Sequence, residues 1–188
     1  MEPVPLCSGE VIVTVEHPSQ MMSVDWNTCR ASAIVVPDAM SIPAVKSHAG
    51  GRPVGMLVNA DGWNPEEDIG AEWPSERLIG RFKNIVSRAT HEEADFIYLR
   101  MRQNLHVLRA AVLAVTDQCG LGILVEIPVD EDRRTADNSS ALAVMGILQR
   151  IGVAGIILAG EPADVDDAIE ELAPYANVAL GVSVEPHE

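Results

Sequence analysis

Seven short apolar runs, separated by longer amphipathic or polar segments, limit what this chain can fold into. The runs are almost continuously apolar instead of alternating with polar residues, which is typical of strands covered on both faces in a parallel sheet. They occupy residues 11–16, 32–37, 53–59, 95–100, 122–127, 154–159 and 177–184. The sequence therefore predicts seven parallel strands.

The segments between these runs carry the spacing of amphipathic helices. In residues 75–93 the apolar side chains fall on one stripe at helical spacing, and the pattern recurs in the segment that begins near Leu105. Ser139 or Ser140 is a candidate cap for the helix that follows, and Pro162 suits the first turn of another. Strand and helix therefore alternate along the chain.

Two architectures fit this alternation: a doubly wound open sheet and a (β/α) barrel that lacks its last unit. No GxGxxG or GxxxxGK[ST] motif follows any of the runs, so the usual nucleotide fingerprints of the open sheet are missing. We therefore predict an α/β, TIM-barrel-like fold shortened to about seven parallel strands. It forms one domain over residues 1–188, since 188 residues suit a single core.

The charge balance disfavours two classes of partner. The chain has 28 acidic and 13 basic residues, and its formal charge of −15 repels nucleic-acid backbones and anionic membrane surfaces. No uninterrupted apolar run reaches the length of about 18 residues that a membrane span needs. Three cysteines without a CxxC pair suit a reducing compartment. We expect a cytoplasmic protein with no nucleic-acid or membrane partner.

In a parallel barrel the chemistry gathers at the carboxyl ends of the strands. Polar residues stand at several of the predicted strand ends, and Arg100 is the one basic residue expected among them. It can neutralise Glu126, or bind a carboxylate or phosphate as a bidentate fork. A structural ion pair is the alternative. The sequence assigns no catalytic residue, and its predicted ligand-binding residues are Glu16, Asn59, Arg100, Glu126 and Asp130.

A metal site is the less favoured interpretation of these strand ends. His17, Glu126 and His187 are residue types that bind zinc, and three ligands with a water would make a catalytic site. No two of these residues have the spacing of a metal-binding motif, so we expect them to be solvated or pocket-lining polar groups. The prediction is that the protein has no cofactor and no zinc.

From about Glu93 onward the chain resembles the homocysteine S-methyltransferase family. Three stretches carry the resemblance, in the family's order and spacing: EEADFIYLRMRQNLHVLRAAV, GILVEIPVDEDRRT, and the segment from LQRIGVAGIILAGEP to ANVALGVSVEP. The resemblance covers roughly half of the chain. It implies a (β/α)8 barrel in which three cysteine thiolates hold a zinc ion that activates the thiol of homocysteine.

The residues that would do this chemistry differ here. The family's first cysteine falls at or near Gly160, and its second and third follow an eighth strand, whereas this sequence reaches Glu188 just past the seventh. An acidic residue that would hold the substrate's amino group is matched by Arg100, which would repel an ammonium group. We therefore expect a methyltransferase-like protein of one-carbon metabolism that lacks zinc-dependent methyl transfer. It would bind a small ligand or a partner protein.

Two further questions stay open at this point. The loop VDEDRRTADNSS, residues 129–140, is either part of a former active site or a solvated loop that caps the next helix. The stretches VTVEHP and SAIVVPDAM also resemble methylenetetrahydrofolate reductase barrels, in which Glu16 would be the acidic residue that ends the first strand. An active folate-linked enzyme, or a methyltransferase with a rebuilt site, is thus the alternative function.

A seven-stranded barrel would leave an open edge, so we also expect a homo-oligomer or a partner chain to cover it.

Overall fold

A computed structural model describes residues 11–14, 31–59, 74–100 and 105–183 of the chain. Its strands are β1 (Val11–Thr14), β2 (Ala31–Val36), β3 (Val54–Asn59), β4 (Phe96–Arg100), β5 (Gly122–Pro128), β6 (Gly155–Ala159) and β7 (Ala179–Ser183). Its helices are η1 (Ala39–Ser41), α2 (Ile42–His48), α3 (Pro74–His91), α4 (Leu105–Gln118), α5 (Ala141–Arg150), α6 (Pro162–Leu172) and η3 (Ala173–Tyr175). The predicted alternation of strands and helices is confirmed.

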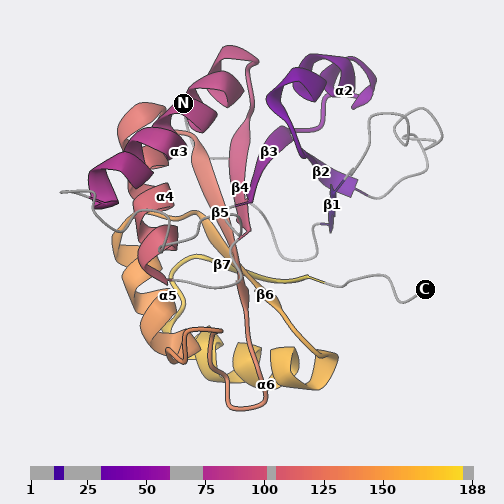
Figure 1. Cartoon of the computed structure of the whole chain (residues 1–188). Helices are drawn as coiled ribbons and strands as arrows, with labels where there is room; N and C mark the ends of the chain where they lie inside the picture. Colours follow the sequence, from indigo (N-terminus) through magenta and orange to yellow (C-terminus); the bar gives the residue numbers. More distant parts are fainter. Residues whose placement is uncertain (1–10, 15–30, 60–73, 101–104, 184–188) are drawn as a thin grey trace.

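The order of the strands distinguishes the two predicted architectures. All seven lie in one sheet in the order β1-β2-β3-β4-β5-β6-β7, and each neighbouring pair is parallel. A doubly wound sheet reverses its strand order at a switch point. This sheet never reverses, so it is a curled part of a (β/α) barrel, as predicted. Figure 1 shows α3, α4, α5 and α6 along one side of it.

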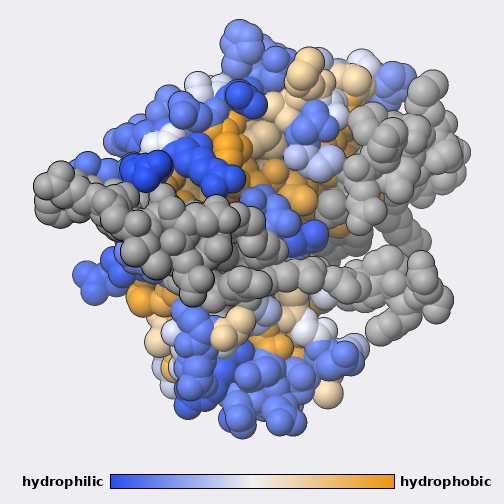
Figure 2. Space-filling model, viewed as in Figure 1, coloured by the Kyte–Doolittle hydropathy of each residue, from blue (hydrophilic) through white to orange (hydrophobic). Residues whose placement is uncertain are grey.

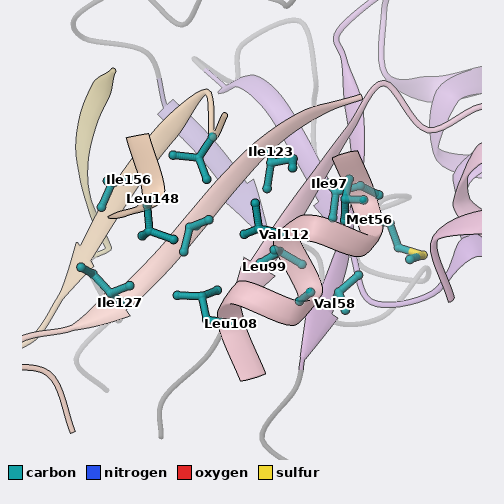
Figure 3. Packing of buried hydrophobic residues seen from close by; sticks show 14 of the residues in the cluster. Met56, Val58, Ile97, Leu99, Leu108, Val112, Ile123, Ile127, Leu148 and Ile156 are labelled. Atoms are coloured by element: carbon teal, nitrogen blue, oxygen red, sulfur yellow. The ribbon is translucent and has the colours of Figure 1, made fainter. Parts of the chain in front are cut away.

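The main core lies between the sheet and these helices. Side chains alternate between the faces of a strand, so Ile97 and Leu99 of β4 point toward the helices together with Ile123 of β5. Leu108 and Val112 of α4 pack against them, as Figure 3 shows. This burial explains why the strands read as continuous apolar runs: one set of alternate residues packs on the helices and the other set is also covered.

The other set forms a smaller cluster on the concave face of the sheet. Its buried members are Ala33, Val35, Phe96, Tyr98, Leu124 and Ile157. Phe96 fills the space above Gly55, where an added Cβ would lie 2.4 Å from the ring. A glycine in β3 thus lets a large aromatic ring close the amino end of the concave face.

Helix starts agree with the sequence less closely than strands do. Pro162 begins α6 as predicted, and Ser140 occupies the N-cap position of α5. The Ser140 side chain makes no capping hydrogen bond, however, so that expected interaction is wrong. Asp38 is the N-cap of η1. Its carboxylate accepts hydrogen bonds from the Ser41 amide at 2.9 Å and from the Ser41 hydroxyl at 2.7 Å.

Within the described residues β1 and β7 each pair with a single strand, so the sheet has two open edges. Their covering by a second chain stays a prediction. Among the coloured residues of the face shown in Figure 2, hydrophilic residues predominate toward the upper left and the bottom, with hydrophobic residues visible inward from them. None of the described helices combines the length and apolarity that crossing a membrane requires.

Candidate ligand site at the carboxyl edge

Three of the predicted ligand-binding residues lie side by side at the carboxyl edge of the sheet. The register pairs Asn59 of β3 with Arg100 of β4, and Arg100 with Glu126 of β5. Parallel strands in register bring residues at equal height next to each other, and all three share the concave face with Tyr98. The structure thus assembles one row of polar residues from three strands.

Glu126 is the centre of this row. Its side chain is only 3% exposed, and it accepts hydrogen bonds from two residues of β4. The Tyr98 hydroxyl donates to Oε2 at 2.6 Å, while Arg100 donates through Nε to Oε1 at 2.8 Å and through Nη2 to Oε2 at 3.3 Å. Both carboxylate oxygens are satisfied, which is what a buried charge requires.

The burial and the charges shift two pKa values. Burial raises the pKa of Tyr98 far above its usual value, and the hydrogen bond to the Glu126 carboxylate and that group's charge raise it further. Burial is the largest single influence and lowers the pKa of Arg100, but the charge of Glu126, its hydrogen bonds and the smaller influence of Tyr98 together outweigh burial, so the net shift is upward. Tyr98 therefore stays neutral and Arg100 stays charged throughout the physiological range.

Arg100 keeps donor capacity beyond this contact. Its side chain is 24% exposed, and both of its bonds to Glu126 use the edge of the guanidinium formed by Nε and Nη2. A guanidinium has five N–H donors, so with respect to the described residues a second edge, formed by Nη1 and the other Nη2 proton, remains. Glu126 fixes the plane of the group, and the second edge is suited to an oxyanion or another pair of acceptors.

Small and mostly apolar residues flank the polar row. In register with Glu126 lie Ile157 of β6 and, next along, Gly181 of β7. Two residues further toward the carboxyl edge, the same face carries Pro128, Ala159 and Ser183, which are aligned with one another. A ligand held by Arg100 would therefore meet a surface with few charges on the side of β5 to β7.

Asp130, another predicted ligand-binding residue, is used within its own loop. Its Oδ1 accepts from the amides of Asp132 at 3.0 Å and Arg134 at 2.9 Å. The loop closes as a small hairpin with an antiparallel bridge between Arg134 and Ser140, and Arg133 adopts a left-handed φ of 57°. The structure thus places Asp130 in a turn, apart from the hydrogen-bonded group around Glu126.

Asp137 is the residue of this loop that sequence reasoning missed. Its Oδ2 accepts from the amide of Leu105, the first residue of α4, at 3.1 Å, and its Oδ1 accepts from the Thr135 hydroxyl at 2.7 Å. Partial burial alone would raise the pKa of Asp137, but the bonds from Thr135, Leu105 and Ser139 lower it below its usual value. The loop therefore caps the preceding helix, α4, through Asp137, whereas the sequence indicated capping of the following helix.

Some predicted residues lie outside the described part of the chain. These are Glu16, His17 and His187, so the predictions made for them stay predictions. Within the described residues, no three His, Cys, Asp or Glu side chains are grouped so that they could hold a metal ion. Cys119 lies at the end of α4, ahead of β5, where its Sγ donates to the Val115 carbonyl at 3.4 Å.

Gly160, where the family resemblance places a zinc-binding cysteine, has no room for a side chain. A Cβ built there would lie 2.5 Å from the carbonyl oxygen of Val129, a backbone atom. A thiolate at this position would require the chain after β5 or after β6 to shift. The residues present at this position do not fit the zinc site that the resemblance implies.

Comparison with known proteins gives neighbours in structure only. No family model and no curated protein sequence matches the chain. The homocysteine methyltransferase MmuM from Escherichia coli in its apo form superposes with a TM-score of 0.74 at 12% identity, over 91% of this chain and 80% of that one. Its metallated form superposes with a TM-score of 0.67 at 13% identity, over 89% of this chain and 72% of that one. The carboxyl transferase domain of Rhizobium etli pyruvate carboxylase superposes with a TM-score of 0.65 at 10% identity, over 92% of this chain and 35% of that one. The chain has a TIM-barrel-like fold. At these identities the similarity establishes the fold and no more.

Proposed function

We propose that this protein binds a small anionic ligand through Arg100, on a methyltransferase-like barrel that does not carry out zinc-dependent methyl transfer. The observation that carries the proposal is the bidentate contact between Arg100 and Glu126, which orients the guanidinium and leaves its second edge for a ligand. The partly exposed position of Arg100 at the carboxyl edge, where barrels place their active sites, supports it.

Two features argue against homocysteine as the ligand of this site. A fixed positive charge at Arg100 repels the substrate's ammonium group, which the family holds with an acidic residue. Gly160 also approaches the Val129 carbonyl too closely for a thiolate ligand to zinc. The ligand we propose therefore meets Arg100 through negatively charged oxygens, and its chemistry does not depend on a zinc-bound thiolate.

A neighbour of the same fold supports this ligand class. The pyruvate carboxylase domain was determined with 3-bromopyruvate, a short carboxylate. The alternative of an active folate-linked enzyme stays a prediction, because it depends on Glu16, which lies outside the described residues.

The proposal is tested by anion binding to the purified full chain. Acetate and inorganic phosphate are titrated separately, and binding is followed by ligand-detected NMR. We expect at least one of them to bind, with a Kd on the order of millimolar, since so small a ligand gains little more than one charge-assisted contact. Arg100→Gln should abolish binding, and Arg100→Lys should weaken it severalfold, because lysine keeps the charge but loses the planar pair of donors.

Arg109→Lys is the matched control, because Arg109 is an exposed residue of α4 that takes no part in the site. It should leave binding unchanged. Equal binding by the parent chain and Arg100→Gln would refute the proposal. Elemental mass spectrometry on the same untagged protein should find zinc well below one atom per chain, and stoichiometric zinc would refute the second half of the proposal.

A further inference from the structure

We infer that the ligand at Arg100 is a singly charged carboxylate with a short aliphatic body, in preference to a phosphate. This inference rests on the proposed function and gives the chemical class of its ligand. It follows from the shape of the remaining donor edge, the charge around it and the residues beside it.

The donor geometry favours a planar group. Glu126 occupies the Nε and Nη2 edge of Arg100, at 2.8 Å and 3.3 Å, so the ligand meets the edge formed by Nη1 and Nη2. Two parallel N–H bonds on that edge match the two oxygens of a carboxylate. Phosphate satisfies the same edge with two of its oxygens, but the rest of its oxygens then need donors elsewhere.

The surrounding charges favour a single negative charge. Glu126 already balances the charge of Arg100 at a distance of 2.8 Å. The two arginines of the β5–α5 loop have partners of their own: Arg133 pairs with Glu171 at 2.8 Å, and Arg134 donates to the Asn138 carbonyl at 2.8 Å. With a formal charge of −15 on the whole chain, a doubly charged phosphate gains little here and is repelled at longer range.

The neighbouring residues favour an aliphatic body. Beyond Glu126 on the same face of the sheet lie Pro128 of β5 and Ala159 of β6, which are register partners. Both are partly exposed, and their small apolar side chains offer contact to a short hydrocarbon chain. A carboxylate anchored on Arg100 can extend over them without desolvating a charged side chain.

Titrations of the full chain with acetate, butyrate and inorganic phosphate at pH 7.5 test this inference. Each fully buried methylene contributes about fourfold in affinity, and butyrate has two more methylenes than acetate, so it should bind about fourfold to sixteenfold more tightly, depending on how much of its chain is buried. Phosphate should bind more weakly than acetate. Glu126→Gln keeps the size and one acceptor oxygen of residue 126 but removes its negative charge. The net charge of the site therefore becomes more positive by one. The preference between acetate and phosphate should then shift toward phosphate.

The matched control is Glu131→Gln, an equal charge change at an exposed residue of the β5–α5 loop. It should leave the order of affinities as in the parent chain. If phosphate binds as tightly as butyrate and Arg100→Gln abolishes both, this inference is overturned while the proposed function stands. If neither butyrate, acetate nor phosphate depends on Arg100, both fail.

Discussion

Strand β4 has an ion pair at each of its ends, and the two pairs differ in burial and in what they hold. Just ahead of the strand, Asp95 pairs with Lys46 at 2.9 Å, and their side chains are 34% and 30% exposed. At the other end Arg100 pairs with Glu126 at 2.8 Å, with side chains 24% and 3% exposed. The amino-end pair remains in contact with water, whereas the carboxyl-end pair includes a buried carboxylate.

The partners explain this difference. Asp95 also accepts from the Val54 amide at 2.7 Å, and Lys46 also donates to the Glu93 carbonyl, so the amino-end pair ties α2, β3 and the start of β4 together. Among the residues that the structure describes, the carboxyl-end pair joins side chains of β4 and β5 only. A buried ion pair is a poor source of stability, because desolvation cancels much of its attraction. These contacts support a structural role for the amino-end pair, while the ligand-binding role of the carboxyl-end pair is the one that we propose.

The largest expected effect comes from removing the cation at each end. Arg100→Met leaves Glu126 buried without its counter-ion, which should lower the free energy of unfolding by about 3–5 kcal/mol. Lys46→Met leaves a carboxylate that water reaches and that keeps its bond to the Val54 amide, so the loss should be about 1 kcal/mol or less. Urea unfolding at pH 7 measures both. Equal losses would remove the distinction between the two ends.

The row of polar residues at the carboxyl edge can be predicted from the sequence, because it depends on the periodic pattern of parallel strands. Seven apolar runs gave the strands, and parallel alignment placed the strand ends at one edge, which brought Asn59, Arg100 and Glu126 together. Tyr98 was available to the same reasoning, since it stands two residues before Arg100 and so shares its face. The pattern does not single out its hydroxyl, because the residue lies inside an apolar run.

The role of Asp137 could not be predicted in this way. Its capping partner, the Leu105 amide, is 32 residues away in sequence, and local cap patterns describe only a helix that follows its cap directly. The close approach of Gly160 to the Val129 carbonyl also depends on how two loops meet in space. Both features depend on tertiary geometry, which periodicity does not encode.

The second-largest expected effect is a pH dependence of stability that comes from Tyr98, which bonds to the carboxyl-end pair. The pKa of Tyr98 is raised in the folded chain, so above about pH 10 the unfolded chain releases this proton while the folded chain retains it. The unfolded state then binds fewer protons, so the contribution of Tyr98 to stability is constant below about pH 10 and falls above it. Tyr98 should contribute up to about 1.4 kcal/mol per pH unit to this fall.

Urea unfolding of the parent chain and Tyr98→Phe between pH 9 and 11 measures this contribution. The fall should be shallower in Tyr98→Phe by up to that amount, because the residue no longer ionises in either state. Tyr175→Phe, which changes an exposed tyrosine, is the control and should keep the Tyr98 contribution. An identical pH dependence in the parent chain and Tyr98→Phe would contradict the hydrogen-bonded group around Glu126.

The smallest expected effect on stability concerns the β5–α5 loop, which follows the strand that carries Glu126. Asp137→Ala removes the acceptor of the Leu105 amide and should destabilise the protein by about 1 kcal/mol at pH 7, as loss of a helix cap does. The pKa of Asp137 is lowered in the folded chain, so its contribution is present above the unfolded value near 3.8 and is lost as the pH falls through the folded value. The difference between parent and variant should therefore shrink in acid. Asp132→Ala, in the same exposed loop, should change stability by less than about 0.5 kcal/mol. If the two variants are equally destabilised, the loop is held by its turns alone and α4 begins without help from Asp137.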